Sequence, residues 1–483
     1  MSSLPLPPAP DASDASTDGS FRALSLSPAM LANLEELGYR VMTPIQAASL
    51  PLGLAGHDLV AQAKTGSGKT AAFGLVLLAN LVGKRELRGP DVQALVLCPT
   101  RELADQVAAE IRRLARAEEN LKVLVLCGGS AMRAQLDSLR HGAQVVVGTP
   151  GRVLDHLARG TLRLDALRTL VLDEADRMLD MGFHADMVKV ASACPTARQT
   201  LLFSATYPPG IAELARQFLR EPREVKLLEQ HAPTKIRQYF HQVSEHERAE
   251  AVVRLLAEHR PERSLAFCNT RQSCRDVLAH LQGRGFVALA LHGELEQVER
   301  DQVLVQFTNR SCSVLVATDV AARGLDIAEL EAVINVELPP DPEQHIHRIG
   351  RTGRVDAEGL ALSLASARDA TKLGRIEAAA GHALEWRELV PLARDARITL
   401  VPPMVTLQLQ GGRKEKLRAG DVRGALTGAA GLSADQVGKI TVNEYSTYVA
   451  VARTSARAAL EALTHGKVKG RTVKVRLLAP RLG

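Results

Sequence analysis

The sequence predicts an α/β protein in which two tandem parallel-sheet domains are followed by a small α+β domain. The chain has 483 residues, more than a single hydrophobic core usually holds. Short, continuously apolar runs alternate with helical patterns in two successive regions, as is typical of parallel sheets covered by helices on both faces. A third region at the C-terminal end has a different pattern and a basic composition.

The first region covers residues 21–227. It follows residues 1–20, whose Pro-, Ala-, Ser- and Asp-rich composition predicts disorder. A short strand is expected in HDLVAQA, and buried strands are expected in QALVLCPT, KVLVLCGG, AQVVVGTP, TLVLDEAD and QTLLFSAT. Each apolar run stops at Gly, Pro or a polar residue, which places a turn at the carboxyl end of each predicted strand.

The same pattern repeats after a predicted linker at residues 228–234. The second region, residues 235–400, has expected strands in RSLAFCNT, ALALHGE, SVLVATDV and AVINVELP. The third region, residues 404–483, has shorter elements whose predicted order is βαββαβ. That order indicates a split βαβ module of the RRM type.

Charge is distributed unevenly along the chain. Residues 404–483 contain 14 Lys and Arg against 5 Asp and Glu, whereas the rest of the chain is slightly acidic. Such a segment is typical either of a polyanion-binding surface or of a solvated face. The six cysteines form no C-x-x-C pair and are expected to be buried thiols in a reducing compartment. No signal peptide, membrane span or obligate oligomer is expected, so the predicted location is the cytoplasm.

The segment AQAKTGSGKT lies between a predicted strand and an apolar helix. It fits A-x-x-x-x-G-K-T, with Ala63 where phosphate-binding loops usually have Gly. Gly66 and Gly68 allow backbone N–H groups to turn toward phosphate oxygens, and the N-terminus of the following helix favours the same anion. Lys69 is expected to reach the β- and γ-phosphates, and the Thr70 hydroxyl to bind Mg²⁺. The alternative interpretation is a Gly-rich turn that contains a lysine by chance.

The strand end in TLVLDEAD supplies carboxylates that a nucleotide hydrolase needs. Asp173 is expected to hold Mg²⁺ through water, and Glu174 to orient or deprotonate the attacking water. The alternative is an acidic cap at the start of a helix. Gln46 in GYRVMTPIQ offers a donor and an acceptor that match N6 and N7 of adenine, which predicts ATP as the nucleotide. Phe21 is a candidate to stack on the adenine, although a lone Phe is more often a core residue.

Taken in order, these and further motifs resemble those of the DEAD-box RNA helicases. The first region contains TPIQ, AKTGSGKT, PTRELADQ, GG, TPGR, DEAD and SAT, and the second contains AFCNT, HGELEQVER, ATDVAARGLDI and HRIGRTGR. The match covers about residues 21–390 and departs from the family at Met42, where Pro is usual. The resemblance implies two RecA-like domains and an RNA-dependent ATPase that separates short RNA duplexes.

The resemblance also implies roles for individual residues. Arg351 and Arg354 resemble arginine fingers that stabilise charge on the γ-phosphate, which would make hydrolysis conditional on closure of the two domains. The resemblance implies that Asp326 contacts the ribose. It also implies that Ser204 and Thr206, together with His347, couple hydrolysis to the RNA site. The implied contacts to the RNA backbone are Arg101, Gly129, Thr149, Arg152, Asn269, Thr270, Arg300 and Thr318. Backbone contacts position an RNA without reading its sequence.

The basic third region resembles the C-terminal RNA-binding domain of one bacterial member of this family. That member recognises a hairpin in the peptidyl-transferase region of 23S ribosomal RNA and acts in assembly of the large subunit, so the resemblance implies the same target. The residues themselves add that only Tyr448 matches an aromatic position of the RRM pattern, and that Val451 replaces another. Binding is therefore expected to depend on Lys467, Lys469, Arg471, Lys474 and Arg476.

Two alternatives remain open at this point. One is a general DEAD-box helicase whose tail tethers it to RNA without preference, with a role in RNA decay or in the cold response. The other is a catalytically silent RNA-binding scaffold. A DNA translocase is disfavoured because the family motifs contact ribose 2′-hydroxyls.

Overall fold

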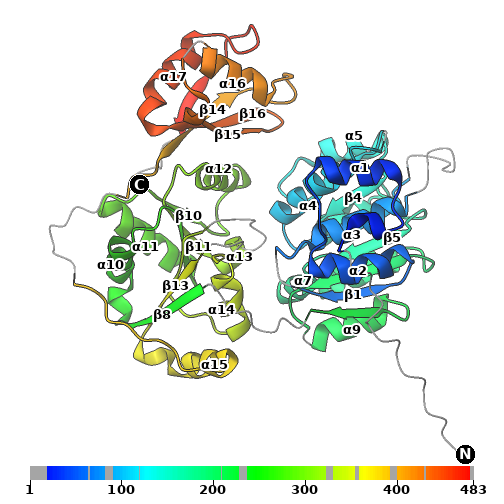
Figure 1. Cartoon of the computed structure of the whole chain (residues 1–483), viewed down its shortest axis with the longest axis horizontal. Coiled ribbons are helices and arrows are strands. Elements are labelled where there is room, and N and C mark those ends of the chain that lie inside the picture. The colour runs from blue at the N-terminus through cyan, green and yellow to red at the C-terminus, as the bar shows by residue number, and fades with distance from the viewer. Residues whose placement is uncertain are drawn as a thin grey trace, which may run out of the picture. The chain divides into compact units, whose positions relative to one another are not determined.

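The computed structural model describes residues 19–63, 66–81, 91–118, 120–207, 209–227, 236–322, 330–353, 358–391, 400–428 and 431–478. These residues form three sheets with their covering helices (Figure 1). The chain divides into two compact units, of which the first contains the first sheet and the second contains the other two. The predicted linker at residues 228–234 and most of the predicted disordered segment lie outside the described residues.

The first sheet is parallel, in the order β3-β4-β2-β5-β6-β1-β7. Strands β2, β4, β5 and β6 are buried along their whole length, because their side chains point into helical layers on both faces. The predicted parallel fold is thus confirmed. The strands are β1 (Leu59–Gln62), β2 (Ala94–Leu97), β3 (Val123–Leu126), β4 (Val145–Gly148), β5 (Thr169–Leu172), β6 (Gln199–Ser204) and β7 (Arg223–Lys226).

Helices fill the connections between these strands. Helix α3 follows β1 and is apolar on all sides, and its Phe73 packs against Phe203 of β6 with ring centroids 5.3 Å apart. Helix α4 is amphipathic and begins at Thr100, whose hydroxyl accepts a hydrogen bond from the Leu103 N–H. The helices are α1 (Pro28–Glu36), α2 (Pro44–Leu54), α3 (Lys69–Ala79), α4 (Arg101–Leu114), α5 (Met132–Arg140), α6 (Pro150–Ala158), α7 (Ala175–Asp180), α8 (His184–Ser192) and α9 (Pro209–Phe218).

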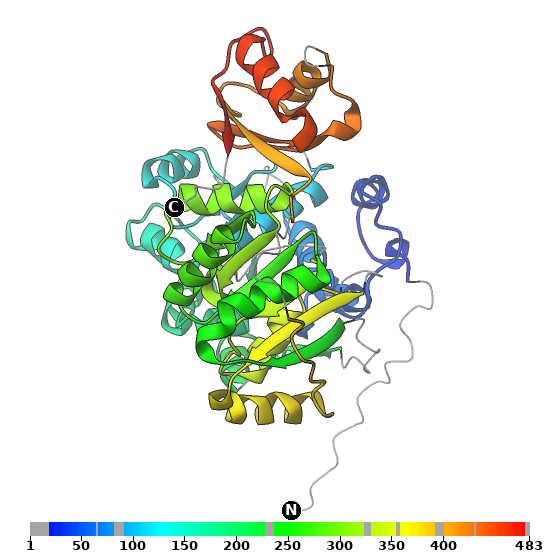
Figure 2. The same cartoon turned by 90° about the vertical axis from the view of Figure 1, so that its left-hand side faces the viewer.

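The second sheet is also parallel, in the order β10-β11-β9-β12-β13-β8. Figure 2 shows this sheet, in green and yellow, with its helices. The strands are β8 (Ile236–Gln242), β9 (Ser264–Cys268), β10 (Ala288–Leu291), β11 (Val314–Thr318), β12 (Ala332–Asn335) and β13 (Gly359–Ala365). The helices are α10 (Arg248–His259), α11 (Arg271–Gly283), α12 (Gln297–Thr308), α13 (Asp319–Ala322), α14 (Pro342–Ile349) and α15 (Ala370–Ala380).

The outer edge of this sheet is covered by the chain that follows α15. The Phe240 N–H of β8 donates to the Glu385 carbonyl at 2.8 Å, and the Arg387 N–H donates to the Phe240 carbonyl at 2.9 Å. Trp386, the single tryptophan of the chain, lies between these contacts with its ring centroid 5.9 Å from that of Phe240. This pairing satisfies backbone groups that an edge strand would otherwise leave open. It also places a fluorescent side chain on the second sheet.

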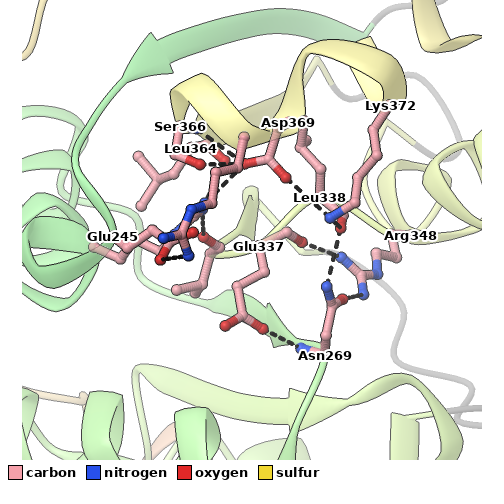
Figure 3. A network of polar contacts seen from close by, with 12 residues as sticks. Glu245, Asn269, Glu337, Leu338, Arg348, Leu364, Ser366, Asp369 and Lys372 are labelled. Atoms are coloured by element: carbon pink, nitrogen blue, oxygen red, sulfur yellow. Dashed lines mark hydrogen bonds and ion pairs between the residues drawn. The ribbon is translucent and has the colours of Figure 1, made fainter. Parts of the chain in front are cut away.

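A buried arginine ties together the strand ends of the second domain, and Figure 3 shows its contacts with Asn269 and Glu337. The Arg348 side chain is 2% exposed and forms a bidentate ion pair with Asp319, at 2.7 and 2.5 Å. Its guanidinium also donates to the side-chain oxygens of Asn269 and Asn335 and to the Glu337 carbonyl. Because these partners follow or end β9, β11 and β12, Arg348 fixes three strand ends relative to one another.

A second cluster in the same view holds the start of α10 against α15. Asp369 accepts hydrogen bonds from Arg248, Ser366 and Lys372, and Arg248 also donates to the Leu364 carbonyl. Burial alone would raise the pKa of Asp369, but these hydrogen bonds lower it to about 2. The carboxylate is therefore charged throughout the physiological range and keeps the cluster ionic.

The third sheet is antiparallel, in the order β15-β16-β14-β17, with α16 and α17 packed on one face (Figure 2). Thr406, on the other face of β14, is fully buried and hydrogen-bonds to Asn309 and Ser311 of the second sheet's domain. The predicted βαββαβ order is confirmed. The elements are β14 (Met404–Gln410), α16 (Ala419–Gly428), β15 (Val437–Val442), β16 (Ser446–Ala452), α17 (Ala456–His465) and β17 (Val475–Leu478).

Arg348→Met should destabilise the second domain by about 3–5 kcal/mol, because it leaves Asp319 without its buried cation. Urea unfolding followed by Trp386 fluorescence reports on that domain. Arg368→Met is the control, since Arg368 is 83% exposed in a surface pair with Glu245 and should change stability by less than about 1 kcal/mol. Equal stability of the Arg348→Met and parent proteins would contradict the structural role of this side chain.

Candidate nucleotide and RNA sites

The predicted phosphate-binding loop connects β1 to α3. Gly66 and Gly68 have φ values of +84° and +95°, in the left-handed region that favours glycine. Lys69 is buried, and its Nζ donates to the Ala63 carbonyl at 2.7 Å. Thr70 lies in the first turn of α3. The structure therefore brings the four predicted phosphate residues together at one helix N-terminus, with the lysine folded back onto the loop.

Gln46 lies directly against this loop and is 2% exposed. Its Oε1 accepts from the Thr43 N–H at 2.9 Å, and its Nε2 donates to the Gly68 carbonyl at 3.1 Å. One N–H and one lone pair of the amide remain for a ligand, which is what the predicted adenine contact requires. The role in base recognition stays a prediction.

Phe21 is 3% exposed and packs edge-to-face on Tyr39, with ring centroids 5.9 Å apart. It belongs to the hydrophobic core of the first domain. It also lines a cavity of about 370 Å³ with Leu31, Leu34 and Arg40. The structure thus shows a core residue at the wall of a cavity, and stacking on a base stays a prediction.

Two predicted catalytic carboxylates follow β5 directly. Burial raises the pKa of Asp173 to about 7, with Lys69 acting in the opposite direction and Glu174 in the same direction. Glu174 has a left-handed backbone, with φ of +52°, and its carboxylate pairs with Arg177 at 2.5 Å. Both side chains of that pair are less than 10% exposed. A non-glycine residue in this conformation is strained, as is common at functional sites.

The oxygen atoms at this position suit a hard cation. Asp173 Oδ1 is buried and has no hydrogen-bond partner among the described residues. A buried carboxylate oxygen without a partner and a threonine hydroxyl are both oxygen ligands of the kind that Mg²⁺ prefers. Asp173 and Thr70 are thus the residues that could hold the ion.

The last carboxylate of the DEAD segment binds the SAT segment, which the sequence analysis did not anticipate. Asp176 Oδ2 accepts hydrogen bonds from the Ala205 N–H and from the N–H and hydroxyl of Thr206, at 2.9–3.1 Å. Burial would raise the pKa of Asp176, but these hydrogen bonds and the charge of Lys69 lower it below its usual value. Ser204 ends β6, and its buried hydroxyl has no partner among the described residues. Because β5 and β6 are neighbours, their loops meet side by side.

The predicted RNA contacts of the first domain lie at the ends of three adjacent strands. Arg101 begins α4 after β2, Gly129 follows β3 with φ of +75°, and Thr149 precedes α6 after β4. Since β3, β4 and β2 are consecutive in the sheet, these turns share one edge. Arg152, in the first turn of α6, donates to the Ser130 carbonyl at 3.1 Å and so joins two of the turns.

The second domain places its predicted residues at the corresponding edge of its own sheet. Thr318 ends β11, Arg300 lies on α12, and Thr270 caps α11 by accepting from the Ser273 N–H. The Asn269 amide is used within the protein: it accepts from Arg348 and donates to the Leu338 carbonyl. His347 lies on α14, and Arg351 follows this helix. Arg354 and Asp326 lie outside the described residues.

In the third domain, the predicted basic residues lie around the connection from α17 to β17. Lys469 has a left-handed backbone, and its Nζ donates to the Lys416 carbonyl at 2.6 Å. Arg476, Gln408 and Tyr448 form a hydrogen-bonded row across β17, β14 and β16. Tyr448 is only 3% exposed, so its ring offers little surface for stacking, in line with the expected poor stacking platform. The remaining basic residues of the prediction are Lys467, Arg471 and Lys474.

Comparison with known proteins agrees with this arrangement. Three family models match: DEAD/DEAH box helicase over residues 43–214, the helicase conserved C-terminal domain over residues 247–356, and the DbpA RNA binding domain over residues 406–477. The ATP-dependent RNA helicase DbpA of Escherichia coli is 51% identical over 94% of this chain and 98% of its own length. The chain belongs to the DEAD-box ATP-dependent RNA helicases. The expected RNA-dependent ATPase is thereby confirmed at the level of the family.

Other DEAD-box helicases match about three quarters of this chain. CshA of Geobacillus kaustophilus is 43% identical over 74% of this chain and 76% of its own length. The structure of Saccharomyces cerevisiae Dbp5 bound to RNA and ADP BeF3 has a TM-score of 0.70 and 30% identity, covering 77% of this chain and 96% of that chain. Within the described part of this DEAD-box helicase, no helix is both long and apolar enough to cross a membrane.

Gly68→Ala should weaken ATP binding about tenfold or more, because the new Cβ would lie 2.6 Å from Gln46 Nε2 in a backbone conformation that strains alanine. Titration with a fluorescent ATP analogue measures this loss. Gly374→Ala is the matched control, since a Cβ at that helical position meets nothing within 4 Å. Unchanged ATP affinity in a folded Gly68→Ala protein would show that the contact between Gly68 and Gln46 is not needed.

Proposed function

We propose that this chain is an RNA helicase of the DbpA type that is directed to a 23S ribosomal RNA hairpin during assembly of the large ribosomal subunit. The proposal is carried by one observation: the similarity to DbpA extends through the third domain, where the DbpA RNA binding domain matches residues 406–477. CshA matches a smaller share of this chain, 74% against 94% for DbpA. The third domain is therefore the part that would choose the RNA.

In the proposed nucleotide site, the residues after β1 and β5 act together. Lys69 leaves the Ala63 carbonyl and binds the β- and γ-phosphates, while the backbone N–H groups of the loop surround the same oxygens. Asp173 and Thr70 would hold Mg²⁺, which when bound neutralises charge on these phosphates. Glu174 orients the attacking water and accepts its proton. Gln46 selects adenine, Phe21 stacks on the base, and Asp326 contacts the ribose.

Hydrolysis would require both helicase domains. Arg351 and Arg354 belong to the second domain and would stabilise the charge that develops on the γ-phosphate. His347 would meet the SAT segment, so that Ser204 and Thr206 report the state of the nucleotide to the RNA site. Asp176 supports this coupling because it already holds the Thr206 N–H and hydroxyl. Closure on ATP and RNA then assembles the site, and hydrolysis releases the RNA.

RNA would be held by its backbone in the helicase domains and by its shape in the third domain. The eight predicted backbone contacts carry no sequence information. A buried Tyr448 and a basic connection from α17 to β17 favour contacts to the phosphates of a structured hairpin over base stacking. A non-specific basic tether is the second candidate, and the basic composition of residues 404–483 would serve it equally well.

RNA-stimulated ATPase activity separates these candidates. The full chain and residues 1–403 would each be tested with the 23S hairpin fragment and with an unrelated RNA of equal length. We expect strong stimulation by the hairpin alone and its loss on truncation. Equal stimulation by both RNAs would contradict the ribosomal target.

The Glu174→Gln variant should bind ATP and RNA but should not hydrolyse ATP. If the parent chain is equally inactive, the chain is a catalytically silent scaffold.

Within the full chain, combined replacement of Lys467, Lys469 and Arg471 by Ala should weaken hairpin binding about tenfold, since each phosphate contact contributes to affinity. Arg457→Ala on the neighbouring helix is the control, because this side chain is 91% exposed and pairs with Glu461 on its own helix. ATPase activity without RNA should be unchanged in all variants. Retained hairpin selectivity in the triple variant would place the specificity surface elsewhere in the chain.

A further inference from the structure

A chain of buried polar side chains lies behind the proposed RNA-binding edge of the first domain. Gln135 on α5 is 5% exposed and His156 on α6 is fully buried. The Gln135 Oε1 accepts hydrogen bonds from Arg152 at 2.8 Å and from His156 Nε2 at 3.0 Å, while its Nε2 donates to the Cys127 carbonyl at 3.0 Å. One glutamine side chain thus contacts β3, α6 and the guanidinium of Arg152.

The hydrogen-bonding pattern fixes the state of the histidine. Because the Gln135 Oε1 can only accept, the proton of the neutral imidazole is assigned to Nε2. His156 Nδ1 lies 3.0 Å from the Thr161 hydroxyl oxygen, and the same hydroxyl donates to the His156 carbonyl at 3.0 Å. Burial, and after it the charge of Arg152, lower the pKa of His156 and keep the ring neutral. The Gln135 amide oxygen, the Gln135 amide nitrogen and His156 Nε2 each have a partner, which favours a rigid network.

Arg152 is the point where this network reaches the surface. Its side chain is 15% exposed, and the same Nη1 that donates to Gln135 also donates to the Ser130 carbonyl beyond the Gly128–Gly129 turn. Arg152 and Gly129 are both proposed RNA contacts, but they lie on different turns. Gln135 joins them, since it holds Arg152 on one side and the carbonyl of Cys127, just before the turn, on the other.

We propose that Gln135 and His156 are positioning residues for RNA binding: they hold Arg152 and the Gly128–Gly129 turn as one preorganised surface for the RNA backbone. This inference rests on the proposed RNA contact of Arg152. The ligand is the sugar-phosphate backbone of single-stranded RNA. Preorganised side chains lose less conformational freedom on binding, so loss of the network reduces affinity without removing a contact to RNA.

Binding of a fluorescein-labelled oligo-uridylate to the full chain in ADP BeF3, measured by anisotropy, tests the proposal. Gln135→Met keeps the length of the side chain and removes all three hydrogen bonds. It should weaken RNA binding about tenfold, as expected for one charge-assisted hydrogen bond, while ATPase activity without RNA stays the same. Ser138→Ala, at an exposed position of the same helix, should leave both unchanged.

A double-mutant cycle separates positioning from general destabilisation. If Gln135 acts partly through Arg152, the loss of binding free energy in the chain with Gln135→Met and Arg152→Met is smaller than the sum of the losses in the two single variants. Additive losses would overturn the inference, as would parent-like affinity of folded Gln135→Met. If Arg152→Met itself binds normally, the proposed RNA role of Arg152 fails and the inference fails with it.

The histidine provides an independent second variant if Gln135→Met does not fold. His156→Phe keeps a ring but loses the donor to Gln135, and should weaken RNA binding in the same way. His156→Gln retains a donor at the position of Nε2 and should restore most of the affinity. Equal affinity of His156→Phe and the parent, or equal loss in both histidine variants, would contradict a positioning role for this hydrogen bond.

Discussion

Parallel strand pairing is the constraint on which both helicase domains depend. In a parallel sheet, every strand delivers its following turn to the same edge, so neighbours in the sheet become neighbours in the site. The order β2-β5-β6-β1 therefore sets the DEAD segment after β5 beside the SAT segment after β6 and near the phosphate-binding loop after β1. The hydrogen bonds from Thr206 to Asp176 are a direct consequence of that order.

Burial of charge at these edges decides which side chains are structural and which are available for chemistry. Asp176 is engaged by the SAT segment through Oδ2 and by the Arg177 N–H through Oδ1, and Arg348 is engaged by Asp319 and the strand ends around it. Asp173 keeps an unpartnered oxygen among the described residues, and Lys69 donates to a loop carbonyl that phosphate can replace. Asp176 and Arg348 thus stabilise the frame, and we propose that Asp173 and Lys69 use their remaining capacity to bind the ligand.

The sequence predicted most of the fold because buried parallel strands are continuous apolar runs bounded by turn residues. It did not single out β7 and β8, whose exposed positions carry charged and polar side chains, or β13. The phosphate residues were predictable from local spacing. Asp176, Gln135 and Arg348 were not, because their partners are distant in the sequence and become neighbours only when the sheets form. Asn269 was assigned to RNA, while the structure shows its amide holding Arg348.

We propose that nucleotide and RNA together close the two helicase domains, so that arginines of the second domain complete a site in the first. Fluorescence energy transfer between labels at Arg140→Cys and Arg368→Cys measures this directly, because both positions are exposed and all six native cysteines are buried. Closure that requires both ligands predicts a change in transfer efficiency with ADP BeF3 and RNA together, and no change with either alone. The same transfer efficiency under all conditions, or full closure with nucleotide alone, would contradict closure by nucleotide and RNA together.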